Sequence, residues 1–279
     1  MSAAPVASRP LPTPRLPGFG VSLGITSVVV GALVVLPLIA LVVVVARAEP
    51  SHVMEVLGSE RTLMAYGLSF GASALAAILS APLGLGIAWT LVRYEVPGRR
   101  FFDALVDLPF AMPTAVSGIA LTQLWGPSGV FGAALQPLGL EVAFTRAGVV
   151  LALIFVSLPF VVRTVQPVIE SFPRETEEAA ASLGADRVTT FRRVIFPALR
   201  PALLAGATLG FARAIGEYGS VVFIAGNVPF RTEIAPLLVL VRLEEYDYAG
   251  AAAISTGMLV ASGAILVILS QRAKGLRHG

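Results

Sequence analysis

One charged stretch in the second half of the chain decides how the rest of the sequence is interpreted. It reads Ser171-Phe-Pro-Arg-Glu-Thr-Glu-Glu-Ala-Ala-Ala-Ser-Leu-Gly184 and continues as Ala-Asp-Arg-Val-Thr-Thr-Phe-Arg-Arg-Val-Ile-Phe-Pro197. Pro173 suits a first helical turn, and the alanines that follow are strong helix formers. Gly184 can adopt the left-handed conformation that ends a helix. The first part of this stretch therefore predicts a short surface helix.

The second part predicts another helix. Asp186 is a suitable N-cap, and Pro197 is expected to end the helix before the next apolar run. The apolar positions at helical spacing are Val188, Phe191 and Val194 or Ile195. Such a stripe, rimmed with charge, is what an amphipathic helix needs to dock into a groove of another protein.

Long apolar runs lie on both sides of this stretch. Of the 279 residues, 56% are hydrophobic and only 13% are charged, about half the charge of a typical soluble domain. A membrane helix needs about 20 apolar residues, and six segments are long enough. These are 21–46, 62–92, 103–125, 148–169, 201–224 and 249–271. The sequence predicts an all-α, polytopic membrane protein with six transmembrane helices.

Basic residues predict the orientation of these spans. If the N-terminus is cytoplasmic, thirteen of the 20 Lys and Arg residues fall on the inner side and five on the outer side, with Arg163 and Arg213 inside spans. Both termini are then cytoplasmic, as tails over residues 1–20 and 271–279. The outer residues are Arg47, Arg61, Arg146, Arg231 and Arg242. This distribution accounts for the basic balance without a nucleic-acid partner.

Several kinds of chemistry are missing from the sequence. The chain has no cysteine and only two histidines, so it offers no thiolate or histidine metal site. A nucleotide-binding P-loop needs Gly-Lys followed by Ser or Thr, but Gly275 follows Lys274, the only lysine. We expect no catalytic residue and no cofactor bound by this chain, and any ATP and Mg²⁺ would be used by another subunit.

Arg213 and Glu217 are charges inside the fifth predicted span. Charged groups at that depth are costly and usually face a cavity or a partner. Being four residues apart, the two side chains would share a helix face, either as a structural ion pair or as part of a translocation path. Tyr218 and Ser220 follow them and suit either a narrow anion path or tight packing.

The charged stretch also resembles the coupling loop of bacterial ABC import permeases. The resemblance rests on Glu178-Ala179-Ala180, then Gly184 after three residues, then Val194-Ile-Phe-Pro197 after nine. It implies that Glu178, Ala179, Ala180, Gly184, Phe191 and Pro197 contact an ATP-hydrolysing subunit. It also implies a type-I ABC importer transmembrane domain, placed here at residues 60–270 after a separate first helix.

A second resemblance is to the sulfate and thiosulfate permeases, and within them to the T-type subunit. It is carried by Arg93-Tyr-Glu-Val-Pro-Gly-Arg-Arg100, by Arg213–Asn227 and by Thr232–Tyr248. The resemblance implies import of sulfate or thiosulfate across the bacterial inner membrane. The implied partners are two copies of a cytoplasmic ATPase, a W-type permease and a periplasmic binding protein. Two alternatives stay open: a molybdate or tungstate permease, and an ion-coupled anion transporter.

Overall fold

The computed structural model describes residues 18–275, and that part of the chain contains helices and no strand. The chain divides into two compact units, Met1–Arg47 and Ala48–Gly279. Within the described residues, five helices are long and apolar enough to cross a membrane, or six if one bent pair counts as a span. This agrees with the predicted all-α membrane fold.

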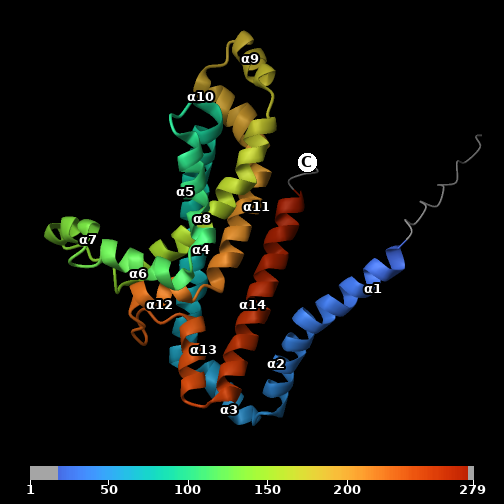
Figure 1. Cartoon of the computed structure of the whole chain (residues 1–279), viewed down its shortest axis with the longest axis vertical. Helices are drawn as coiled ribbons and strands as arrows, with labels where there is room; N and C mark the ends of the chain where they lie inside the picture. The colour runs from blue at the N-terminus through green and yellow to red at the C-terminus, as the bar shows by residue number, and fades with distance from the viewer. Residues whose placement is uncertain (1–17, 276–279) are drawn as a thin grey trace, which may run out of the picture. The chain divides into compact units, whose positions relative to one another are not determined.

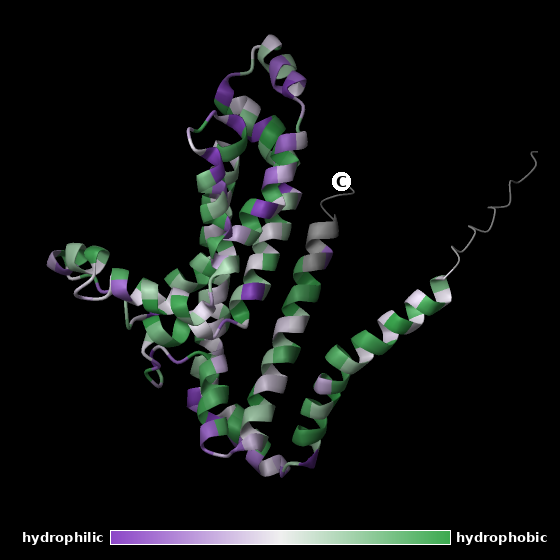
Figure 2. Cartoon of the chain, in the orientation of Figure 1, coloured by the Kyte–Doolittle hydropathy of each residue, from purple (hydrophilic) through white to green (hydrophobic). Residues whose placement is uncertain are grey.

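The first unit is one long apolar helix. It comprises α1 (Phe19–Val30), a π-helical turn η1 (Gly31–Val35) and α2 (Leu36–Arg47). The wide turn precedes Pro37, whose ring would clash with the carbonyl four residues back in a regular helix. Figure 2 shows the helix apolar along nearly its whole length, and none of its described residues is buried. It matches the span predicted at 21–46, whereas residues 1–17 of the predicted tail lie outside the described range.

Three long helices form the core of the second unit. These are α4 (Glu60–Arg93), α8 (Arg146–Ser171) and α11 (Phe196–Ile215), which pack along one another (Figure 1). Small residues allow the close approach: a Cβ at Gly206 would lie 2.9 Å from Cα of Val161, and one at Gly210 would lie 3.2 Å from Cβ of Ser157. The glycine pair on α11 therefore serves packing within the chain.

The third predicted span is broken. Helices α5 (Arg99–Ala111) and α6 (Thr114–Trp125) meet at an angle of 115°, so residues 103–125 do not form one helix. Met112 between them is extended, with φ −86° and ψ 138°, because Pro113 disfavours helical geometry at the residue before it. The short helices α7 (Val130–Leu135) and η2 (Gln136–Leu138) follow α6.

The fifth predicted span ends early. Helix α11 stops at Ile215, and α12 (Gly219–Ala225) is a separate short helix packed against α6. A Cβ at Gly118 would lie 2.5 Å from the carbonyl oxygen of Ser220, so the two helices cross at backbone contact. Glu217 thus lies in the break after α11, and not inside the span where the sequence placed it.

The remaining helices lie at the two ends of the second unit (Figure 1). One end carries α9 (Arg174–Ser182) and α10 (Arg187–Thr190). The other carries α3 (Pro50–Gly58) and α13 (Ala235–Glu244), which pack against α14 (Tyr248–Gly275). The α9 end is strongly hydrophilic in Figure 2. The sixth span, predicted at 249–271, corresponds to α14, and residues 276–279 of the predicted tail lie outside the described residues.

Candidate functional site

The charged stretch forms the predicted helix pair. Helix α9 ends at Ser182, and Gly184 just beyond it has φ +83° and donates its N–H to the carbonyl of Ala181 at 2.9 Å. The N–H of Ala185 reaches the carbonyl of Ala180 at 3.1 Å, and together these two bonds form a Schellman cap. Asp186 caps α10 by accepting the N–H of Thr189 at 2.9 Å, and the hydrogen bonds from Thr189 lower the pKa of Asp186. The predicted helix-ending conformation of Gly184 and the predicted N-cap role of Asp186 are confirmed.

The predicted helix end at Pro197 is wrong. A π turn, η3 (Phe191–Ile195), joins α10 to α11, and the helix continues from Arg187 to Ile215. The N–H of Phe196 bonds to the carbonyl of Phe191, five residues back. This wider turn moves the preceding carbonyls away from the proline ring, so the helix accommodates Pro197.

The apolar stripe of the second helix faces two directions. Phe191 packs edge-to-face on Trp89 of α4, with ring centroids 5.8 Å apart, and Ile195 is buried. Leu183 and Val188 are instead 90% and 62% exposed. The stripe is therefore not one outward-facing surface. Phe191 and Ile195 attach the helix pair to its own chain, and Leu183 and Val188 remain available to a partner.

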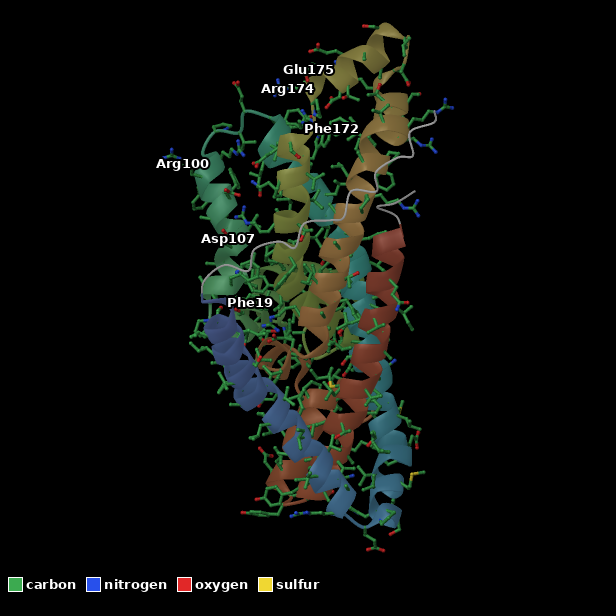
Figure 3. All side chains as sticks on the ribbon, turned by 90° about the vertical axis from the view of Figure 1, so that its right-hand side faces the viewer. Phe19, Arg100, Asp107, Phe172, Arg174 and Glu175 are labelled. Atoms are coloured by element: carbon green, nitrogen blue, oxygen red, sulfur yellow. The ribbon has the colours of Figure 1, made fainter. Side chains whose placement is uncertain are left out.

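A charged contact attaches α9 to α4. Arg93 lies with its guanidinium 5.3 Å from the ring centroid of Trp89, and its Nη2 approaches Oε1 of Glu177 at 2.8 Å. The approach is an ion pair without hydrogen-bond geometry. Figure 3 shows Arg174 and Glu175 at the same end of the unit as Arg100, the second residue of α5. The helix pair is thus attached to the C-terminal end of α4.

The other residues of the predicted coupling loop differ in their exposure. Glu178, Ala179 and Pro197 are exposed, and Ala180 is half-buried. Gly184 and the neighbouring Leu183 are exposed as well. Arg93, Trp89 and Glu177 were not among the predicted site residues. Sequence alone could have indicated Arg93 as a basic residue at a span end, but not its contact with Glu177.

The four predicted path residues lie at the break between α11 and α12. Three contacts hold the Glu217 carboxylate in place: Oε2 lies 2.6 Å from Nη1 of Arg213, and Oε1 accepts the N–H and hydroxyl of Ser220 at 2.9 and 3.0 Å. Glu217 and Ser220 are buried in this chain, while Arg213 is partly exposed and Tyr218 is exposed. Glu217 therefore caps α12 and also pairs with Arg213.

A second intramembrane cluster joins α5 to α8. Arg163 makes bonds of 2.7 and 2.6 Å to the two carboxylate oxygens of Asp107, and its Nη1 lies 2.7 Å from Oδ1 of Asp103. The same Nη1 donates to Oε1 of Gln166 at 2.8 Å. The sequence placed Arg163 inside a span, but none of these residues was predicted to belong to a site. The sequence could have indicated this cluster, because two aspartates four residues apart lie in one apolar run and an arginine lies in another.

Comparison with known proteins places the chain in a family. Residues 80–274 match the family described as "Binding-protein-dependent transport system inner membrane component". The sulfate transport system permease protein CysT of Salmonella typhimurium is 45% identical over 264 residues, which cover 95% of each chain. A probable sulfate transport system permease protein cysT of Nephroselmis olivacea is 48% identical over 236 residues, covering 85% of this chain and 83% of the relative.

Solved structures show the same fold. A chain of a bacterial alginate ABC transporter, in complex with an alginate pentasaccharide-bound periplasmic protein, aligns with a TM-score of 0.73 at 19% identity. The alignment covers 92% of this chain and 94% of that chain. A chain of a methionine ABC transporter in an inward-facing conformation aligns with a TM-score of 0.56. The chain therefore belongs to the binding-protein-dependent transport system inner membrane component family and, within it, to the CysT-type sulfate transport permeases.

Proposed function

We propose that this chain is the membrane-spanning permease subunit of an ABC importer that moves sulfate or thiosulfate across the bacterial inner membrane. The chain itself binds no cofactor and catalyses no reaction. Two copies of a cytoplasmic ATPase use ATP and Mg²⁺, a W-type permease completes the membrane domain, and a periplasmic binding protein delivers the anion. The near full-length similarity to sulfate permeases supports this choice of substrate.

The observation that carries the proposal is the helix pair α9–α10. It combines an exposed apolar residue, Leu183, with a firm attachment to the transmembrane helices through Trp89 and Phe191. A loop that transmits force needs both properties, because it must contact a motor on one side and a rigid helix on the other. In this proposal the ATPases move the loop, and the membrane helices alternate between inward-facing and outward-facing states.

The path is proposed to pass the break between α11 and α12. Arg213 and Tyr218 are the members of the predicted set that reach the surface of this chain, and an arginine can attract a divalent anion. Glu217 would moderate that attraction through the 2.6 Å ion pair, so that the anion is not held too tightly to leave. Ser220 would act indirectly, by holding the Glu217 carboxylate.

The proposed orientation places the α9 end and both termini in the cytoplasm. The basic residues support it, because Arg174, Arg187, Arg192, Arg193 and Arg200 all lie at or near the helix pair. The end with α3 and α13 then faces the periplasm, where the binding protein would dock.

Reconstitution tests the proposal. The chain, its permease partner and the ATPase would be placed in proteoliposomes with ATP on the ATPase side, and labelled sulfate would be delivered by the binding protein. We expect uptake that requires ATP while the proton gradient is held fixed. Uptake that changes with an imposed proton gradient and does not require ATP would instead identify an ion-coupled transporter. Competition by thiosulfate, molybdate and tungstate then ranks the anions.

Cross-linking tests the coupling loop separately. The chain has no cysteine, so Ala179→Cys adds a single thiol to an exposed position of α9. We expect a cross-link from this thiol to the ATPase during turnover. Labelling of the thiol only by reagents outside the cell would reverse the proposed orientation.

A further inference from the structure

A basic pocket lies away from the coupling loop, on the side predicted to face the periplasm. Its volume is about 390 Å³, and its lining includes Gly67 and Gly71 of α4, Arg146 at the start of α8, and Phe230, Arg231 and Glu233 from the loop between α12 and α13. Neither Arg146 nor Arg231 belongs to the coupling loop or to the proposed path. The pocket is therefore separate from the residues described so far.

The pocket carries uncompensated positive charge. Within residues 18–275, no carboxylate forms an ion pair with Arg146 or Arg231. The one acidic lining residue, Glu233, is held by two 2.7 Å hydrogen bonds from Arg61, so its charge is already neutralised. Two guanidinium charges remain, which matches the charge of a divalent anion.

The loop that presents Arg231 is rigidly built. The Thr232 hydroxyl donates to the carbonyl of Ala225 at 2.8 Å and accepts the N–H of Val228 at 3.0 Å. The Val228 carbonyl accepts the N–H groups of residues 231, 232 and 233. Phe230 has φ +62°, an unfavourable conformation for an aromatic residue, and such strain clusters at functional sites.

The same loop fixes the second arginine. Nε of Arg146 donates to the backbone carbonyl of Arg231 at 3.1 Å, which leaves the two terminal nitrogens of Arg146 available. Gly67 and Gly71 leave the opposite wall open, since a Cβ on either would meet no atom within 4 Å. The cavity thus has room beside both arginines, which are exposed in this chain, and its wall also includes the apolar residues Leu68, Leu75 and Val150.

We propose that Arg146 and Arg231 bind a divalent tetrahedral oxyanion in this pocket, as a receiving site between the binding protein and the Arg213 region. The assignment of sulfate to the site rests on the proposed function. The acidic groups Glu244, Glu245 and Asp247 lie at the end of α13, outside this pocket, so they do not oppose the anion there.

Anion binding is tested on the purified complex without the binding protein. Thermal unfolding would be followed while sodium sulfate replaces sodium chloride at constant ionic strength. We expect a saturable rise in melting temperature for the unsubstituted complex and for the control Arg47→Gln, which removes an exposed outer arginine outside the pocket. The double variant Arg146→Gln/Arg231→Gln should bind sulfate at least about tenfold more weakly.

Three other results would overturn the site. If the double variant kept wild-type sulfate binding and uptake, the two arginines would not bind the anion. The double variant could lose the partner permease, which makes the pocket a protein contact. Phosphatidylglycerol in nanodiscs could give the arginine-dependent shift while sulfate gives none, which assigns the charge to a lipid headgroup. If the unsubstituted complex imports molybdate and not sulfate, the proposed substrate fails, and the same titration with sodium molybdate still tests the site.

Discussion

Arg93 at the end of α4 and Glu177 in α9 lie 2.8 Å apart, although 84 positions separate them along the chain. Within residues 18–275, their contact is the only ion pair that joins the helix pair to a transmembrane helix, and the Arg93 guanidinium also lies 5.3 Å from the ring centroid of Trp89. The pair attaches α9 to α4. In the function proposed above, it would therefore act by positioning the coupling loop.

Arg93→Ala should uncouple ATP hydrolysis from uptake. Loss of the ion pair and of the stacking on Trp89 removes about 1 kcal/mol each, enough to lower sulfate uptake severalfold while the complex still assembles. The ratio of ATP hydrolysed to sulfate imported is the measurement. Arg99→Ala is the matched control, because Arg99 pairs with Glu170 at 3.3 Å on an exposed surface and should have little effect. Equal effects of both variants would remove the special role of Arg93.

Gly184→Ala should weaken the coupling loop through its backbone. A side chain at φ +83° costs about 1 kcal/mol, and a distorted cap would shift Leu183 on the surface proposed to contact the ATPase. We expect lower affinity for the ATPase in a pull-down titration and lower uptake. Gly216→Ala is the control, since Gly216 has φ −97° and open space around it. A fully active Gly184→Ala transporter would mean that the cap does not determine docking.

Arg163→Met should destabilise the membrane domain. It leaves Asp103 and Asp107 without their cation, at a cost of about 2 kcal/mol, less than for a fully buried pair because Asp107 is half-exposed. Adding Asp103→Asn and Asp107→Asn to the variant should restore much of the loss, because no unpaired charge remains. Melting temperatures of the three purified complexes (unsubstituted, Arg163→Met and the triple variant) measure this. Absence of any rescue would show that Arg163 matters by its shape or contacts alone.

Arg213→Ala and Glu217→Ala should differ in kind. Arg213 is partly exposed at the proposed path, so its loss should reduce uptake while assembly persists. Glu217 is buried and caps α12 through Ser220. Its loss should lower the free energy of unfolding by about 1 kcal/mol or more and so reduce the amount of folded complex. Uptake per assembled complex separates the two. Normal sulfate uptake by Arg213→Ala would remove that residue from the path.

Protonation of Asp247 in acid should weaken the attachment of α3 to the start of α14. Burial raises the pKa of Asp247, but the hydrogen bond from His52, the N–H of Gly250 and the charge of Arg242 outweigh it, so the pKa is lowered overall. A lowered pKa in the folded state gives stability that is present above the unfolded pKa of about 4 and is lost as pH falls below it. Hydrogen exchange of α3 should therefore rise below about pH 4. In Asp247→Asn this pH step should be absent.

Much of the architecture could be predicted from hydropathy and helix signals. The first, second, fourth and sixth spans agree with the structure because each is a continuous apolar run without a local break. The third and fifth do not, because Pro113 and the Gly216–Gly219 segment interrupt the helix while the hydropathy stays high. Composition over 20 residues cannot detect a break that a single backbone conformation produces.

The site could be predicted only where it depends on local sequence. The caps at Gly184 and Asp186 follow from short-range rules, and the structure contains both. The inward packing of Phe191 and the ion pairs of Arg93 and Arg163 depend on which helices become neighbours. That information is tertiary, and periodicity along one helix cannot supply it.

The π turn before Pro197 has a mechanical consequence. Helices α10, η3 and α11 form one helix of 29 residues from Arg187 to Ile215, about 43 Å long. Its first residues belong to the helix pair, and Arg213 lies near its other end. In the proposed orientation, a stroke delivered at its cytoplasmic tip would reach the proposed anion path without crossing a loop, and the wide turn is a point where this helix can flex.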